Sequence, residues 1–180
     1  MKIEATNLAG CFIVHDTWLK DDRGYFFESF NKKKFYDLTG ISTDFVQDNQ
    51  SSSVKGVLRG LHFQRGKHAQ AKLVRVLKGK VLDVAVDIRK DSPTYGQHFS
   101  IELSEDSATQ LYIPRGFAHG FVVLSNEATF FYKCDNYYNK SADGGLLYND
   151  PSININWGLP EEELILSEKD KINPLLTDLI

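Results

Sequence analysis

Apolar and polar side chains alternate with a period of two along much of the chain. The clearest example is residues 81–88, where the even positions are large and apolar while Asp83 and Asp87 occupy odd positions. Because successive strand residues point to opposite faces, this pattern predicts a half-buried β-strand. Similar short runs cover residues 11–14, 25–30, 45–50, 57–64, 73–77, 99–103, 110–113, 121–124 and 129–134.

Turn-forming segments separate these runs at residues 21–24, 78–80, 91–93 and 104–106. Most of the connections are too short for crossover helices, so we expect antiparallel pairing. About ten such strands predict an all-β fold, an antiparallel double-stranded β-helix or jelly roll whose wide mouth forms a ligand cavity. Only a few short helices are expected. Asn31 predicts the start of one over residues 32–38, and Ser167 the start of another at Glu168.

The composition narrows the class of protein. A chain of 180 residues with 42% hydrophobic and 25% charged residues is typical of one soluble globular domain, which we place over residues 1–180. No apolar run is long enough to span a bilayer and no signal peptide is evident, so we expect a cytoplasmic protein with no membrane partner. The formal net charge of −3 argues against a nucleic-acid binder.

One stretch is nevertheless basic. Residues 59–75 carry five Lys or Arg side chains and no Asp or Glu: Arg59, Arg65, Lys67, Lys72 and Arg75. Such a cluster can meet an anionic ligand, but a solvated basic face explains the charges equally well.

The segment at residues 57–64 combines Arg and His within a predicted strand. Strict alternation places Arg59 and His62 on opposite faces, and a bulge at Gly60 would turn both into one cavity. A strand histidine can equally be a structural residue held by hydrogen bonds. The local pattern leaves both interpretations of His62 open.

Residues 113–121 contain Pro-x-Gly-x-x-His, which resembles the second motif of the cupin superfamily and ends in His119. Metal-binding cupins supply two further histidines and a glutamate from their first motif. Here the corresponding tripeptide is His62-Phe63-Gln64, and no acid follows before Asp83. An amide is a poor transition-metal ligand, so we expect neither a metal nor another cofactor. Cys11 and Cys134 form no ligand pair and are expected to be buried thiols.

A wider set of motifs resembles the dTDP-4-dehydrorhamnose 3,5-epimerase family. The matching segments occur in the family's order between about Arg23 and about Asp170: residues 22–28 (DRGYFFE), 45–49 (FVQDN), 58–64 (LRGLHFQ), 83–89 (DVAVDIR), 114–121 and 131–133. The resemblance implies a cupin-like epimerase acting on dTDP-4-dehydro-6-deoxy-D-glucose. The ketone of that sugar acidifies the protons on carbons 3 and 5. Inversion needs a base, an acid on the opposite face and a partner for the enolate oxygen.

The resemblance also assigns catalytic roles. It implies that His62 is the base, that Asp170 orients it, that Lys72 faces the keto oxygen and that Tyr132 is the acid. Local sequence alone allows simpler roles: a helix charge for Asp170, a surface side chain for Lys72 and a core side chain for Tyr132.

Further residues match positions that bind substrate. Arg23 and Arg59 are implied to hold the diphosphate, for which the guanidinium fork is suited. Phe27 and Tyr138 are candidates for packing on the base or sugar. The other implied binding residues are Glu28, Gln47, Asn49, His119, Asp143 and Lys169.

Two other functions remain open at this point. A relative on the same scaffold that inverts only carbon 3 or carbon 5 would carry much the same motifs. A non-catalytic jelly roll that binds a sugar nucleotide is a third possibility, although it has no use for an acid opposite a base. The resemblance further implies a homodimer with shared strands, in which residues 23–28 contribute across the interface.

Overall fold

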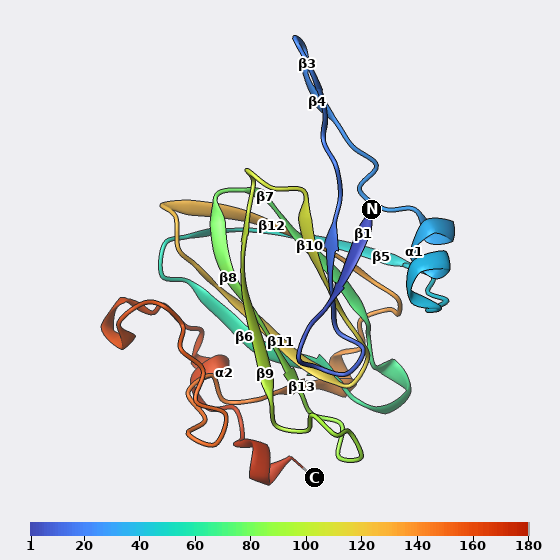
Figure 1. Cartoon of the computed structure of the whole chain (residues 1–180). Coiled ribbons are helices and arrows are strands. Elements are labelled where there is room, and N and C mark those ends of the chain that lie inside the picture. Colours follow the sequence, from blue (N-terminus) through green and yellow to red (C-terminus); the bar gives the residue numbers. More distant parts are fainter. Residues whose placement is uncertain (180) are drawn as a thin grey trace.

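Two antiparallel sheets make up the body of the protein in the computed structural model, which describes residues 1–179 (Figure 1). In this range one sheet has the strand order β1 (Lys2–Ala5), β2 (Phe12–His15), β10 (Thr109–Ile113), β7 (Lys72–Lys78), β12 (Glu127–Cys134) and β5 (Gln47–Val54). The second has the order β13 (Asp143–Gly145), β6 (Leu58–Gln64), β11 (Phe117–Val123), β8 (Lys80–Asp87) and β9 (His98–Ser104). The predicted jelly roll is confirmed.

Apolar side chains from both sheets fill part of the space between them. Val74 and Phe130 come from the first sheet, and Ala85 and Phe121 from the second. The rings of Phe121 and Phe130 stack with their centroids 4.1 Å apart. Both rings also line the main pocket, so this pair lies where the solid core meets the cavity.

The prediction that β8 is half-buried is wrong, because both of its faces are covered. Val84 and Val86 on the even face pack into a cluster with Tyr148 and Trp157 of the C-terminal segment. On the odd face, Asp83 is fully buried between the sheets. The alternation of apolar and polar residues identified the two faces of β8 correctly. The face that carries Asp83 and Asp87 is nevertheless buried and does not contact solvent.

The helices begin where the capping residues predict. Asn31 caps α1 (Lys32–Thr39) by accepting a hydrogen bond from the backbone of Lys34, and Ser167 caps α2 (Glu168–Lys171) in the same way. Residues 1–179 also contain short 3₁₀ helices at Gly66–His68, Lys140–Ala142, Glu161–Glu163 and Leu176–Asp178. None of the helices described is long and apolar enough to cross a membrane.

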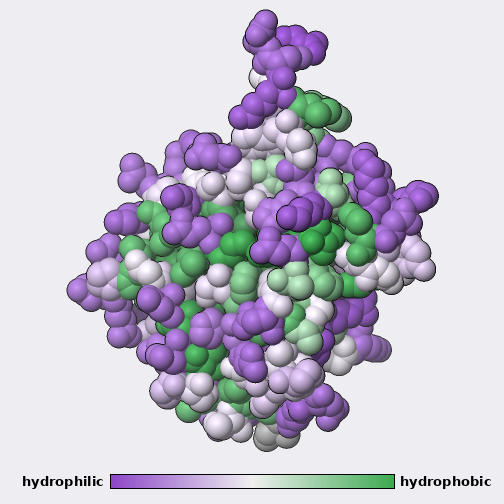
Figure 2. Space-filling view, in the orientation of Figure 1, coloured by the Kyte–Doolittle hydropathy of each residue, from purple (hydrophilic) through white to green (hydrophobic). Residues whose placement is uncertain are grey.

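A β-hairpin projects from the body of the molecule (Figure 1). It consists of β3 (Leu19–Asp21) and β4 (Gly24–Phe26), so most of the strand expected at residues 25–30 is not formed. Leu19, Tyr25 and Phe26 are exposed, and Figure 2 shows hydrophobic surface beneath the hydrophilic tip of this projection. Within this chain the hairpin has no core on which to bury its apolar side chains.

Candidate active site

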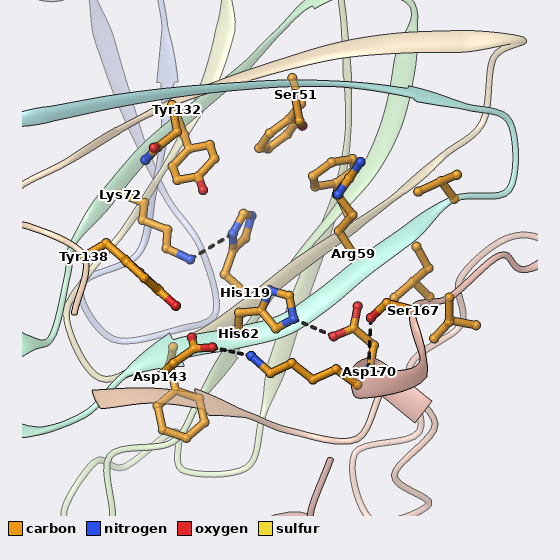
Figure 3. Close-up of a pocket in the computed structure, with 18 of the residues that line it drawn as sticks. Ser51, Arg59, His62, Lys72, His119, Tyr132, Tyr138, Asp143, Ser167 and Asp170 are labelled. Carbon is orange, nitrogen blue, oxygen red and sulfur yellow. Dashed lines mark hydrogen bonds and ion pairs between the residues drawn. The ribbon is translucent and has the colours of Figure 1, made fainter. Parts of the chain in front are cut away.

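A concave site lined by residues of both sheets lies between them. Its cavity measures about 550 Å³ and is open to solvent at one end. Strands β6 and β11 supply one wall, β7 and β12 the facing wall, and the segment around α2 closes a side (Figure 3). Ten of the fourteen predicted site residues line it: Asn49, Arg59, His62, Lys72, His119, Tyr132, Tyr138, Asp143, Lys169 and Asp170.

A bulge in β6 places Arg59 and His62 on the same side of the sheet, as predicted. His62 pairs with His119 of β11 and Arg59 pairs with Phe121, so two residues of β6 lie between these pairs but only one residue of β11 does. Gly60 lies within this irregularity with φ at +139°, where side chains are rarely tolerated. A Cβ there would also lie 2.6 Å from the Cα of Gly120. Only glycine fits at this position.

We predict that Gly60→Ala destabilises the fold by about 3 kcal/mol or more, since backbone strain and a steric clash add together. Gly40→Ala is the matched control: Gly40 also has a positive φ, at +71°, but a Cβ there meets nothing within 4 Å. Urea unfolding of both variants measures the difference. Equal losses of stability would show that the close approach to Gly120 is unimportant.

His62 and Asp170 form a hydrogen-bonded pair, although 108 positions separate them in sequence. The distance from His62 Nε2 to Asp170 Oδ1 is 2.6 Å. Burial raises the pKa of Asp170, but hydrogen bonds from His62, Ser167 and the Gly60 backbone outweigh it and bring the pKa below its usual value. The carboxylate therefore stays ionised and accepts the Nε2 proton, which leaves Nδ1 of His62 free to act as a base.

On the facing wall, Lys72 lies deep in the cavity. Its Nζ is 3.4 Å from Nδ1 of His119, and Nε2 of His119 is 2.8 Å from Oδ1 of Asp83. Burial lowers the pKa of Lys72 and also that of His119. A neutral His119 can then accept from the lysine at Nδ1 and donate to Asp83 from Nε2. Lys72 is thus a buried residue and not the surface side chain that local sequence allowed.

Tyr132 combines the two roles that the sequence left open. Its ring packs beside Phe130, with centroids 6.1 Å apart, and it also lines the cavity. Burial raises its pKa to about 12, so the phenol keeps its proton at neutral pH. Tyr132 lies on β12 and His62 on β6, which belong to facing sheets. An acid and a base therefore line opposite walls of one cavity.

Polar side chains surround the outer part of the cavity. Arg59 is anchored by a 3.0 Å hydrogen bond from its Nε to Ser53 Oγ. Lys169 of α2 forms an ion pair with Asp143 of β13, and both line the pocket. These cationic groups give the open end the charge complementarity that a diphosphate requires.

Gln47 does not line the pocket but supports two residues that do. Its Oε1 accepts a hydrogen bond from the backbone of Tyr138, and its Nε2 donates to Asn49, each at 3.0 Å. In this structure Gln47 therefore holds two pocket residues in place, and its contact with substrate stays a prediction.

The other three predicted residues outside the cavity belong to the hairpin region. Arg23 pairs with Asp21 beside it, and Glu28 pairs with Lys34 of α1. Phe27 lies against the guanidinium of Arg75, 5.3 Å from ring centroid to Cζ. Within a single chain none of the three reaches the cavity, because the hairpin points away from the body.

The residues that would form a cupin metal site are engaged elsewhere. The amide oxygen of Gln64 accepts the backbone N–H of Asn139 at 2.8 Å. His119 is bound to Asp83 and Lys72. Within residues 1–179 no group of three or more His, Cys, Asp or Glu side chains is arranged to hold a metal ion.

Sequence reasoning missed Asp83 as part of the site. It was assigned to the polar face of a half-buried strand, whereas that face lies inside the protein. Ser53 and Ser167, which hold Arg59 and Asp170, were also missed as supporting residues. For Asp83 the sequence did carry a signal of burial, because large apolar residues, Leu82 and Val84, flank the acid on both sides.

Comparison with known proteins agrees with this geometry. The family model of dTDP-4-dehydrorhamnose 3,5-epimerase matches residues 5–178. The enzyme of that name from Salmonella typhimurium is 52% identical over 98% of this chain and 96% of its own length.

Solved structures agree as well. The dTDP-4-dehydrorhamnose 3,5-epimerase from Elizabethkingia anophelis is 55% identical, with a TM-score of 0.97 over 99% of this chain and 98% of that one. A dTDP-6-deoxy-D-glucose-3,5-epimerase from Legionella pneumophila, in complex with dTDP-4-keto-L-rhamnose, is 47% identical, with a TM-score of 0.95 over 99% and 94% of the two chains. From its fold, its cavity and these matches, the chain belongs to the dTDP-4-dehydrorhamnose 3,5-epimerase family.

Proposed function

We propose that this protein inverts carbons 3 and 5 of dTDP-4-dehydro-6-deoxy-D-glucose to give dTDP-4-dehydro-L-rhamnose. The observation that carries this proposal is the placement of His62 and Tyr132 on facing walls of one cavity, with Lys72 buried in the same space. Inversion at a carbon next to a ketone requires such a pair, because the proton leaves from one face and returns to the other.

Each group has a distinct task. His62 takes the proton from the carbon through Nδ1, and the ionised Asp170 stabilises the imidazolium that forms. The electrons of the broken C–H bond move onto the carbonyl oxygen, where the ammonium of Lys72 offsets the negative charge. Tyr132 then gives its phenolic proton to the opposite face of the carbon. Before the next inversion, His62 releases its added proton to solvent, and the phenolate of Tyr132 takes up a proton from solvent.

The same groups can serve both carbons, since carbons 3 and 5 flank one carbonyl. The product therefore distinguishes the candidate functions. Incubation with dTDP-4-dehydro-6-deoxy-D-glucose, followed by proton NMR of the sugar, should show inverted configuration at both carbons. Inversion of a single carbon would support a single-carbon epimerase, and unchanged sugar would support a binding protein.

Residues at the open end of the cavity are proposed to bind the nucleotide. Arg59, fixed by Ser53, is suited to bind the diphosphate in a bidentate manner. Tyr138 is half exposed at the rim and offers a flat surface for the base or sugar. Asn49, His119, Asp143 and Lys169 are the remaining lining residues assigned to binding.

The protein is also proposed to act as a homodimer in the cytoplasm. The projecting hairpin exposes Leu19, Tyr25 and Phe26, which a second copy could bury. In that arrangement Arg23, Phe27 and Glu28 would complete the cavity of the neighbouring subunit. This explains why residues that resemble binding residues lie far from the cavity of their own chain.

Mixing two defective variants tests the shared site. Arg23→Ala and His62→Ala should each be strongly impaired, yet mixed dimers should contain one cavity with both residues intact. If subunits exchange at random, activity should recover to about a quarter of the wild-type value. Activity that stays at the sum of the two variants would place Arg23 in the site of its own chain. Light scattering checks that the mixed sample is dimeric.

A further inference from the structure

Asp83 is a buried acid that does not line the cavity. Its exposure is 0%, and of its two oxygens Oδ1 bonds to His119 while Oδ2 has no hydrogen-bond partner in the described structure. A carboxylate in such a place is costly unless a nearby cation compensates it. Because Asp83 cannot touch a substrate in the cavity, any effect on the reaction must pass through His119.

Lys72 is the cation at the other end of this chain of contacts. The titratable groups around it are Tyr132 and Cys134 on β12, His119 on β11, Asp83 on β8, Asp143 on β13 and His62 on β6. Its strand neighbour on β10 is the apolar Ile113. Asp83 and Asp143 are the carboxylates in this set, and Asp143 already pairs with Lys169. Asp83 is therefore the carboxylate of this set that has no Lys or Arg partner of its own and can balance the charge of Lys72 in the interior.

The geometry of His119 links the two charges. A neutral imidazole has one N–H and one free nitrogen, so it can donate at one end only. Asp83 offers no proton and Lys72 offers several, which fixes the N–H on Nε2 and the free electron pair on Nδ1. The imidazole thus holds the ammonium at 3.4 Å and limits the directions in which Nζ can point.

We propose that Asp83 is a positioning residue which, through His119, aims Lys72 into the cavity and keeps it charged for the enolate oxygen. This inference rests on the proposed epimerase function. It assigns a part in stabilising the negative charge that develops on the substrate to Asp83, which lies behind His119 of the cavity wall.

The proposal sets a direction for pH dependence. Lys72 acts as a cation, so the rate falls as pH rises through its pKa, which burial already lowers from its ordinary value while Asp83 opposes that effect. Removing the charge of Asp83 lowers this pKa further and moves the fall in rate to lower pH. Tyr132 does not set this limb, because its pKa is raised to about 12.

Asp83→Asn is the informative variant, because an amide oxygen still accepts the Nε2 proton of His119 while the charge is lost. We expect kcat to drop roughly 10- to 100-fold, as for other residues that orient a reacting group, with KM little changed. The basic limb of the kcat–pH profile should move down by about one unit. Asp87→Asn is the matched control: Asp87 is equally buried on the same strand but bonds to Arg89, Ser92 and Thr94. Its loss should lower stability without moving the limb.

A second measurement uses the unaltered protein and does not depend on how a variant folds. The nitrogen chemical shifts of His119 in ¹⁵N-labelled protein should show a neutral ring protonated at Nε2 at pH 7. An imidazolium, or a ring protonated at Nδ1, would contradict the proposal that Asp83 acts on Lys72 through His119. An Asp83→Asn enzyme with an unshifted basic limb would contradict it as well. If the wild-type protein yields no epimerised sugar, the proposed function fails, whereas the nitrogen shifts still test the link from Asp83 through His119 to Lys72.

Discussion

Replacing His62 with alanine is expected to lower kcat by roughly 10³-fold or more, near the upper end of what general base catalysis contributes. Binding of dTDP should survive, because the groups assigned to the nucleotide lie at the open end of the cavity and make no hydrogen bond to His62. Isothermal titration calorimetry with dTDP and a product assay together measure the two effects. Added imidazole should restore part of the activity, since the truncated side chain leaves space beside Asp170.

His15→Ala is the control for this variant. His15 also forms a hydrogen-bonded pair with a carboxylate, 3.0 Å from Nε2 to Glu4 Oε2, but it lies on β2 outside the cavity. Its removal should leave kcat unchanged. Full activity of His62→Ala, or equal losses in the two variants, would contradict the assignment of His62 as the base.

Tyr132→Phe should separate proton removal from inversion. Formation of epimerised product is expected to fall roughly 10²- to 10³-fold, because no acid remains on the wall opposite His62. His62 and Asp170 are left intact, however, and can return a solvent deuteron to the face from which the proton left. In deuterated water the recovered substrate should therefore gain deuterium without changing its configuration. NMR of the unreacted sugar measures this directly.

Tyr137→Phe provides a matched loss of one hydroxyl, since Tyr137 is 66% exposed and lies outside the cavity. It should epimerise at the wild-type rate. If Tyr132→Phe also keeps the wild-type rate, another group supplies the proton. If it stops exchange as well as inversion, Tyr132 takes part in proton removal and the assigned roles must be reversed.

The fold was largely predictable because alternation depends on local chemistry. Runs such as residues 81–88 and 129–134 correspond to β8 and β12 with small changes at their ends. The start of β5 was predicted, but its extension through Ser51 to Val54 was not, because serines carry no apolar signal. Alternation also could not show what covers each face, which is why Asp83 was placed on the wrong kind of surface.

The site was predictable only as a set of motifs. Nothing local to His62 or Asp170 indicates that they meet, because the contact depends on how the C-terminal segment returns to β6. That return is held by a bridge between Val57 and Ile165 and by the cap of α2. In the hairpin, the pattern predicted a strand at residues 25–30, yet one chain does not supply a surface that would bury its apolar side chains.

Hydrogen exchange during turnover tests the central claim most directly, that His62 removes protons from both carbons next to the ketone. The wild-type protein and dTDP-4-dehydro-6-deoxy-D-glucose are incubated in deuterated water, and deuterium is located by NMR and mass spectrometry. We predict product with deuterium at both carbon 3 and carbon 5, and essentially none with His62→Ala. Inversion without deuterium at either carbon, or equal exchange with and without His62, would contradict the account.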